Sequence, residues 1–215
     1  MKAAVLHEVN QPLAIEEVEI AKPKRREVLL RTAFAGLSMQ LSAHDLATAA
    51  ADFGIGASWQ LKINASSGTI GSPSGYGQIA ATSVGGAGVR VSPLAMALAA
   101  GLVQSGTWVP PTLVVPADDP PAKASRPFDG QIIASLRSLM RATVTSGAGE
   151  AADVAGRPVY GQIGSTAPGS VGRGLGSSWF VGYRGGIAFA ILEFTRQPST
   201  SAAALAGTFL SNLPG

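Results

Sequence analysis

The sequence predicts a mixed α+β domain, in which an antiparallel sheet is packed by alanine-rich helices and preceded by a short β leader. The chain has 215 residues, 46% of them hydrophobic and 13% charged, which is enough to bury the core of one ordinary domain. Apolar side chains recur at helical spacing in the middle of the chain and alternate at strand spacing after residue 147. The 27 glycines and 14 prolines predict short elements joined by many turns.

The first 31 residues carry most of the local charge and alternate in the manner of short, half-buried strands. A basic run over residues 22–26 separates the second and third of these strands. The run has no interleaved aromatic residues and the net charge of the chain is only +3, so we interpret it as a solvated loop and predict no nucleic-acid partner. The predicted strands span residues 3–6, 14–20 and 27–31.

Three helices are predicted in the middle of the chain, because each apolar segment follows a capping residue. Ser42 precedes residues 43–53, Ser92 and a following proline precede residues 94–104, and Asp129 precedes residues 131–141. Glycines at positions 54 and 106 are expected to end the first two helices. The third helix is expected to turn these apolar residues toward the core: Ile132, Ile133, Leu136, Leu139 and Met140.

The last third of the chain is predicted to form the sheet. Residues 158–163, 178–183 and 187–194 alternate as strands, and residues 183–186 predict a tight hairpin turn between the last two. A closing helix is expected from Ser199 or Thr200 to Leu210. Residues 68–77 and 117–126 are interpreted as loops.

Composition excludes several classes of site. The chain has no cysteine and two histidines, so a disulfide scaffold is excluded and a Cys/His zinc site nearly so, whereas a carboxylate-only metal site stays open. No apolar run reaches the roughly 18 to 20 residues that span a bilayer. The first apolar run is interrupted by His7 and Glu8, which predicts no signal peptide. We predict no metal, no transmembrane segment and no export signal.

Six blocks of the second half stand out by their order and spacing. They are Asp52-Phe53-Gly54-Ile55-Gly56, Val89-Arg90-Val91-Ser92-Pro93-Leu94-Ala95-Met96-Ala97-Leu98, Gly106-Thr107-Trp108-Val109-Pro110-Pro111, the helix around residues 136–140, Val159-Tyr160-Gly161 and Trp179-Phe180-Val181-Gly182-Tyr183. Together these blocks resemble the C-terminal portion of a penicillin-binding protein transpeptidase domain over residues 32–213. The resemblance implies an incomplete transpeptidase/β-lactamase-like fold and a role in cross-linking peptidoglycan.

In that family, a Ser-x-x-Lys helix, a Ser-x-Asn motif and a Lys-Thr/Ser-Gly strand meet at the acylation site. The first two motifs do not occur in this sequence, so no catalytic residue is assigned. The third is altered, because Gln162 stands at the lysine position and cannot supply its cation. Gly164 still allows close backbone approach, and Ser165 or Thr166 can hydrogen-bond a carboxylate. The altered strand, our candidate binding site, comprises Gln162, Ile163, Gly164, Ser165 and Thr166. The alternative is an ordinary edge strand that enters a Gly/Ser loop.

The first segment resembles the opening strands of zinc-dependent medium-chain alcohol dehydrogenases over residues 1–31, through Met1-Lys2-Ala3-Ala4-Val5-Leu6-His7-Glu8 and the strands that follow. Beyond it that family calls for a zinc-binding cysteine, where this chain has Ser38. Residues 75–80 match a loose dinucleotide fingerprint with no strand before it, so no cofactor is predicted. We therefore divide the chain into a dehydrogenase-like leader, 1–31, and a partial transpeptidase-like domain, 32–215, as in a chimera.

These interpretations leave three functional hypotheses. The protein is an inactive transpeptidase-like protein, or a non-catalytic module that binds a peptidoglycan stem peptide, β-lactam or protein partner. The third hypothesis is a dehydrogenase remnant. A shortened sheet is also expected to expose an edge and to self-associate, unless the leader strands cover that edge. The resemblance implies the cell envelope, whereas the missing signal implies the cytoplasm. His44 is interpreted as a surface residue, and Trp179, Phe180 and Tyr183 as packing residues.

Overall fold

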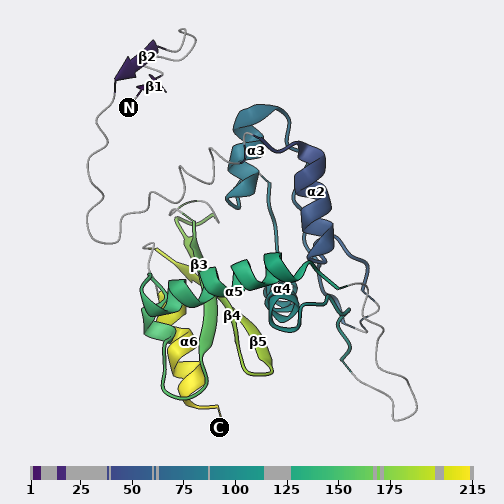
Figure 1. The fold of residues 1–215 in the computed structure, drawn as a ribbon, viewed down its shortest axis with the longest axis vertical. Helices are drawn as coiled ribbons and strands as arrows, with labels where there is room; N and C mark the ends of the chain where they lie inside the picture. Colours follow the sequence, from purple (N-terminus) through teal and green to yellow (C-terminus); the bar gives the residue numbers. More distant parts are fainter. Residues whose placement is uncertain are drawn as a thin grey trace.

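A three-stranded antiparallel sheet with helices on both faces forms the centre of the protein (Figure 1). The computed structural model describes residues 2–5, 14–17, 38, 40–59, 61, 63–86, 88–113, 127–166, 169, 172–196 and 201–213. Its elements are β1 (Lys2–Val5), β2 (Ala14–Glu17), α2 (Ala43–Asp52), α3 (Gly75–Ser83), α4 (Pro93–Ser105), α5 (Gly130–Thr145), η1 (Glu150–Ala152), β3 (Val159–Ser165), β4 (Gly176–Arg184), β5 (Ile187–Thr195) and α6 (Ser201–Ser211). The predicted α+β class, with an antiparallel sheet packed by helices, is confirmed.

The predicted helix starts are confirmed at their capping residues. The Ser42 hydroxyl accepts from the Asp45 N–H, and the Asp45 carboxylate accepts in return from the Ser42 N–H, which together form a capping box. Two hydrogen bonds from Ser42 lower the pKa of Asp45, and the bond from its backbone N–H has a larger effect than the bond from its side chain. Ser92 caps α4 through the Ala95 N–H, and Gly106 ends α4 at a φ of 81°.

Helix α5 differs from its prediction in length and in its buried face. It continues four residues beyond the predicted end at position 141, because Val144 in the added turn is fully buried. Two of the residues expected on the core face, Ile132 and Leu139, are 53% and 56% exposed. The buried face is a narrower stripe at steps of three and four, formed by Ile133, Leu136, Met140 and Val144.

Helix α3 was missed, since residues 68–77 were interpreted as a loop. Glycines at positions 75 and 77 carry little helix propensity, which hides the element in the sequence. The helix begins after Ser74, whose N–H donates to Oε1 of Gln78 at 2.9 Å. The serine and glutamine were the available signal for this helix start. The predicted loop at 117–126 and the predicted strand at 27–31 lie outside the described residues.

The sheet has the strand order β3-β4-β5, and each neighbouring pair is antiparallel. The predicted hairpin turn is confirmed: Arg184 pairs with Ile187 across Gly185 and Gly186. Gly185 has a φ of 57° whereas Gly186 is not in the left-handed region, which is the pattern of a type II′ turn. Strands β1 and β2 pair with one another in a separate two-stranded sheet, so in the described residues they do not cover an edge of the larger one.

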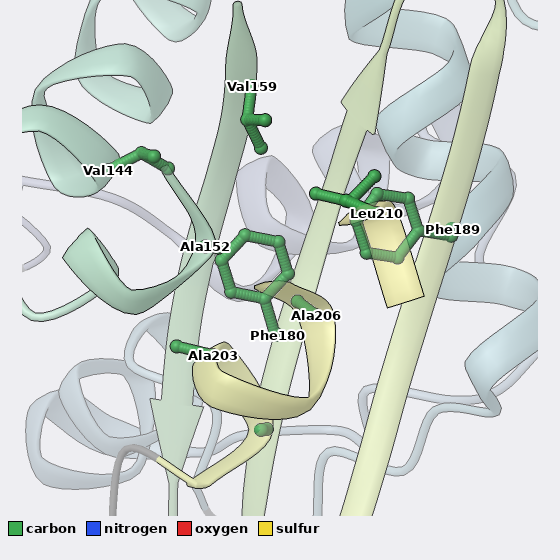
Figure 2. Packing of buried hydrophobic residues seen from close by; sticks show 9 residues of the cluster. Val144, Ala152, Val159, Phe180, Phe189, Ala203, Ala206 and Leu210 are labelled. Carbon is green, nitrogen blue, oxygen red and sulfur yellow. The ribbon is translucent and has the colours of Figure 1, made fainter. Parts of the chain in front are cut away.

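One face of the sheet packs against α6, η1 and the end of α5 (Figure 2). The Phe180 ring, fully buried, lies over two paired glycines, Gly161 of β3 and Gly182 of β4. A Cβ at Gly161 would lie 2.2 Å from the Phe180 ring, so the glycine provides the space that the ring occupies. The fully buried residues around this ring are Val144, Ala152, Val159, Ala202, Ala203, Ala206 and Leu210.

The opposite face packs against α4 and α5. Tyr160 of β3 and Tyr183 of β4 stack there with ring centroids 4.8 Å apart, and the cluster continues into α4 and α5. Phe53, the residue after α2, contacts Phe128 edge-on at 5.2 Å. Because Phe53 and Phe128 both pack against this cluster, α2 is attached to the sheet through its C-terminal end.

Two arginines bind the carbonyl groups at the ends of helices. Arg137 of α5 donates from Nε to the Val103 carbonyl at 2.9 Å and from Nη2 to the Gln104 carbonyl at 2.7 Å, at the last turn of α4. Arg184 of β4 donates from Nη1 to the Leu210 carbonyl at 2.7 Å, near the end of α6. A cation at the C-terminal end of a helix also interacts favourably with the helix dipole. Both helices are thereby fixed to neighbouring elements.

Candidate functional site

The candidate site residues lie in sequence along β3 and just after its end. Side chains alternate across a strand, and the core clusters assign the two faces. Tyr160 packs on the α4/α5 side, whereas Val159 and Ile163 pack on the α6 side. Gln162, Gly164 and Thr166 therefore belong to the α4/α5 face, and Ser165 to the other. The five predicted residues share one strand end but not one face.

Gln162 is exposed and is held by the neighbouring helix. Its Oε1 accepts a hydrogen bond from the Thr143 hydroxyl of α5 at 2.8 Å, and its backbone lies opposite Val181. The amide is neutral, so the strand offers a hydrogen-bonding group in place of a positive charge. The Thr143 contact could not be foreseen, because it joins two elements that the sequence does not relate.

Ile163 and Thr166 are both engaged with the protein itself. Ile163 is half-buried and packs against the cluster around Phe180. The Thr166 hydroxyl accepts from the Ser177 N–H at 2.9 Å and lies 3.0 Å from the Ser177 hydroxyl. The Thr166 N–H also donates to the Ser177 carbonyl, which extends the strand pairing past β3. Thr166 thus extends the pairing between β3 and β4, and its predicted role in carboxylate binding stays a prediction.

The surface above Gly164 is open. A Cβ built on Gly164 would meet Trp179 at 3.8 Å, an ordinary contact, and Gly164 itself is exposed. Its partner in the register is Trp179, which is half-buried. A ligand backbone can approach the strand at this position without displacing protein atoms.

At the outer edge of β3, every second residue points its N–H and C=O groups away from β4. A two-residue hairpin turn makes Arg184 and Ile187 a hydrogen-bonded pair, so the odd-numbered residues of β4 point toward β3. It follows that Gly161, Ile163 and Ser165 direct their N–H and C=O groups toward the outer edge. Residue 159 obeys the same pattern, because its carbonyl accepts from Arg141 rather than from β4.

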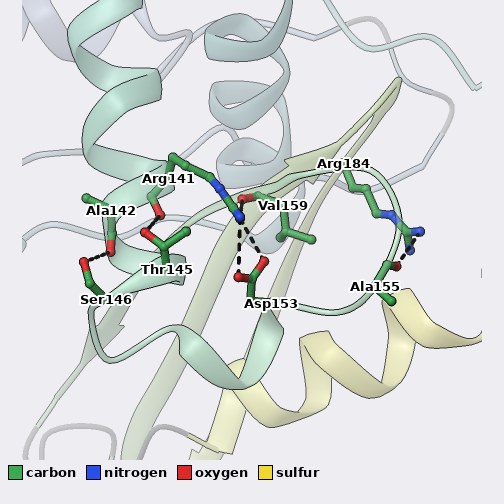
Figure 3. Close-up of polar contacts among 8 residues, drawn as sticks. All are labelled: Arg141, Ala142, Thr145, Ser146, Asp153, Ala155, Val159 and Arg184. Atoms are coloured by element: carbon green, nitrogen blue, oxygen red, sulfur yellow. Dashed lines mark hydrogen bonds and ion pairs between the residues drawn. The ribbon is translucent and has the colours of Figure 1, made fainter.

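Arg141 occupies the start of this edge (Figure 3). Its Nη1 donates to the Val159 carbonyl and to Oδ1 of Asp153, both at 2.9 Å. On the other side of the sheet, Arg184 donates to the Ala155 carbonyl at 3.3 Å. Arg141 thereby holds both ends of the segment that leads into β3, and because Gly161 is buried, the accessible edge begins after that residue.

The hydroxyl of Tyr183 is buried in the cluster beneath this strand and has no hydrogen-bond partner among the described residues. Burial raises the pKa of Tyr183 above 10.0, and the nearby Arg137 charge partly opposes the rise. A raised pKa favours the neutral form in the folded state. The contribution of Tyr183 to the free energy of unfolding is therefore fully present below about pH 10, and it is lost as the pH rises further.

We expect Tyr183→Phe to flatten the alkaline loss of stability. Urea unfolding followed from pH 7 to 11 should show a shallower decline above pH 10 than in the unmodified chain. At pH 7 the free energy of unfolding should change by less than about 1 kcal/mol, because the substitution removes an unpaired buried hydroxyl. Tyr76→Phe, at a residue that is 70% exposed, is the matched control. An unchanged alkaline limb in Tyr183→Phe would contradict the assignment.

In the described ranges, no group of three or more His, Asp or Glu side chains could hold a metal ion. His44 is exposed on α2, as predicted. A cleft of about 260 Å³ between α2 and α3 was not foreseen; its lining includes no titratable group and comprises Leu46, Ala49, Ala50, Phe53, Ile70, Thr82, Ser83 and Val89. No helix in the part of the chain that the structure describes is both long and apolar enough to cross a membrane.

The chain matches the penicillin binding protein transpeptidase domain family over residues 31–209. This match covers most of the chain, and the chain belongs to that family. The resemblance found in the second half of the sequence is therefore confirmed. The match begins where the dehydrogenase-like leader was expected to end, and no comparison supports the dehydrogenase resemblance of the leader. No curated protein matches the chain.

Solved structures show the same fold. Penicillin-binding protein A of M. tuberculosis, as an imipenem acyl-enzyme complex, is similar with a TM-score of 0.70 and 20% identity over 84% of this chain and 45% of that one. A peptidoglycan glycosyltransferase from Burkholderia ambifaria gives 0.65 and 17% over 84% and 60%. The transpeptidase domain of Burkholderia pseudomallei penicillin-binding protein 3 gives 0.65 and 20% over 86% and 63%. This chain thus spans about half the length of the structures that it matches.

Proposed function

We propose that this protein is a transpeptidase-like member of the cell-wall machinery that binds a peptidoglycan stem peptide along β3 without forming an acyl-enzyme. The observation that supports this proposal is the altered sequence of β3. It keeps an open glycine and an outward-facing backbone edge, but a neutral glutamine stands at the position of the family's lysine. The leader at 1–31 and the domain at 32–215 are part of the same proposal.

The binding half of the proposal rests on backbone chemistry. An extended peptide can add to a sheet edge as a further strand, with main-chain hydrogen bonds supplying affinity. Ile163 and Ser165 present such groups, whereas Gly161 is buried, and the space over Gly164 admits the peptide backbone. A terminal carboxylate on the α4/α5 face would meet the Gln162 amide, whereas Ser165 lies on the opposite face. The amide is neutral, so we expect weak binding.

The second part of the proposal, that no acyl-enzyme forms, rests on the missing pair of nucleophile and base. Acylation needs a serine whose proton is taken by a base within hydrogen-bond reach, and the family uses a lysine three residues later. The residues three before Lys22, Lys24, Lys62 and Lys123 are not serine. The β3 edge can therefore orient a peptide, but the sequence contains no paired nucleophile and base of the family's kind.

We expect the purified chain to form no covalent adduct with a fluorescent penicillin, and to bind a labelled D-Ala-D-Ala peptide saturably. Gly164→Trp should weaken peptide binding at least about tenfold, because its indole fills the open surface. Gln162→Lys should tighten binding by about two- to fivefold, as expected for an exposed ion pair. Fluorescence anisotropy measures both, and intact mass spectrometry measures the adduct.

Gly186→Trp is the matched control, since this glycine is also open but lies in the turn between β4 and β5. A stoichiometric penicillin adduct would overturn the inactive assignment. Absence of saturable binding, or equal binding by the Gly164→Trp and Gly186→Trp variants, would overturn the peptide site.

A further inference from the structure

Gln162 is held by two different elements, one at its backbone and one at its side chain. Its backbone lies opposite Val181 in the register of β3 and β4. Val181 is one of the odd-numbered residues of β4 that point toward β3, so the two residues form a hydrogen-bonded pair. The Gln162 side chain is bonded to α5, because its Oε1 accepts from the Thr143 hydroxyl at 2.8 Å. The amide group of Gln162 therefore has a tertiary contact that can fix its orientation.

The Thr143 side chain itself has a defined orientation on α5. A β-branched side chain has few χ1 rotamers in a helix. A Cβ built on Gly149 would lie 3.3 Å from the Thr143 methyl carbon, which places that methyl group against the glycine. The Gly149 N–H also donates to the Thr143 carbonyl at 3.0 Å. With its methyl group against Gly149, Thr143 directs its hydroxyl toward β3.

The Thr143 hydroxyl has one proton and lies near two acceptors. Oε1 of Gln162 is 2.8 Å away and the Leu139 carbonyl is 3.1 Å away. Residue 143 lies inside α5, so the Leu139 carbonyl already accepts the helical hydrogen bond from the Thr143 N–H. The shorter distance and this existing helical bond both favour donation of the hydroxyl proton to Gln162.

This hydrogen bond determines which end of the Gln162 amide faces a ligand. The amide carries an acceptor oxygen and an NH2 group with two donors. Because Oε1 is turned toward Thr143, Nε2 and its two donors are directed away from α5. Gln162 and the open Gly164 belong to the same face and are two residues apart, about 7 Å along the strand. A peptide over Gly164 can therefore reach the Nε2 donors with its terminal group.

We propose that Thr143 is a positioning residue that sets the ligand specificity of the β3 site. By holding Oε1, Thr143 leaves only hydrogen-bond donors for the ligand, and the site selects a peptide that ends in a carboxylate over one that ends in a carboxamide. A carboxylate only accepts hydrogen bonds and forms the stronger, charge-assisted ones. A glutamine that rotates freely would accommodate both ends. The inference rests on the proposed function, because it concerns the ligand of the same strand.

Arg141, the cation at the start of this edge, is engaged by the protein itself. Its Nη1 donates to Oδ1 of Asp153 and to the Val159 carbonyl, both at 2.9 Å, and its Nη2 lies 3.4 Å from Oδ2 of Asp153. The carboxylate of Asp153 thus balances the Arg141 charge. Selection between the two peptide ends at Gln162 then depends on the orientation of the amide.

Paired binding assays on the full chain test this specificity. The probes are two labelled peptides that end in D-Ala-D-Ala, one with a free carboxylate and one with a carboxamide, and fluorescence anisotropy gives both dissociation constants. We expect the unmodified chain to bind the acid at least about threefold more tightly than the amide. Thr143→Val keeps the shape of the side chain without its hydroxyl, so the ratio should fall to near one. Thr143→Ser should restore it.

Thr145→Val is the matched control. The Thr145 hydroxyl donates to the Arg141 carbonyl at 3.1 Å (Figure 3), which is the same contact within α5 that Thr143 makes with Leu139. Thr145 lies two residues beyond Thr143 and hence on a different face of the helix. We expect its acid-to-amide ratio to equal that of the unmodified chain.

A second measurement tests the orientation without any ligand. Nitrogen-15 relaxation of the Gln162 side-chain NH2 group, assigned by its loss in Gln162→Glu, should show restricted motion in the unmodified chain and in Thr145→Val. In Thr143→Val the group should be more mobile. Equal acid-to-amide ratios in the unmodified chain and Thr143→Val, with binding retained, would overturn the inference alone, as would equal NH2 motion in both. If neither peptide binds to any variant, the proposed function itself fails, and the specificity role of Thr143 fails with it.

Discussion

Gly207→Ala is expected to destabilise the protein by about 3 kcal/mol or more. A Cβ at Gly207 of α6 would lie 2.2 Å from the Ala151 carbonyl oxygen in η1, and a backbone atom cannot move aside as a flexible side chain can. The helix would have to shift away from a core in which Ala203 and Ala206 are fully buried. Urea unfolding monitored by circular dichroism measures the loss.

Gly101→Ala is the control for this substitution, because Gly101 also lies inside a helix. A Cβ at Gly101 would meet only the Ala188 side chain at 3.6 Å, an ordinary contact. Alanine has the higher helix propensity, so we expect this variant to be unchanged or more stable by up to about 1 kcal/mol. Equal effects at the two glycines would contradict the assignment of Gly207 to a close backbone contact.

Phe180→Ala is the second substitution with a large expected effect. The ring is fully buried over Gly161 and Gly182, and neither glycine has a side chain that could fill the space left behind. Truncation of a buried phenylalanine costs about 3 to 5 kcal/mol through lost transfer free energy and the remaining cavity. We expect thermal unfolding to show a midpoint lowered by several degrees or more.

Phe209→Ala removes the same ring from a position that is 41% exposed, and should cost about 1 kcal/mol or less. If Phe180→Ala were as mild as Phe209→Ala, the Phe180 ring would not be packed closely against Gly161 and Gly182. Gly161→Val should then also be tolerated, whereas the structure predicts that it displaces the Phe180 ring.

The elements that the sequence predicted well are those determined by adjacent residues. Ser42, Ser92 and Asp129 bond to the first turns of their own helices, so a local pattern is sufficient. The turn at Gly185 and Gly186 is local in the same sense. Helix α3 was missed because its glycines carry little helix propensity, although the Ser74 to Gln78 contact at its start is local.

The buried side of α5 could not be predicted from periodicity alone. Ile132 and Leu139 fit the apolar spacing as well as Ile133 and Met140 do, and only the position of the sheet selects between them. The candidate site has the same limit. Spacing located the strand, but the Thr143 contact of Gln162 depends on packing between separate segments.

The position of α6 has a consequence for synthesis of the chain. Its side chains complete the core around Val144 and Val159 and its Leu210 carbonyl accepts from Arg184, so these contacts form only after the strands have been made. Translation adds about 5 to 20 residues per second, so the paired strands exist for seconds with one apolar face uncovered. We therefore expect the nascent chain to depend on chaperone protection until α6 has left the ribosome, and this dependence arises from chain order rather than from final stability.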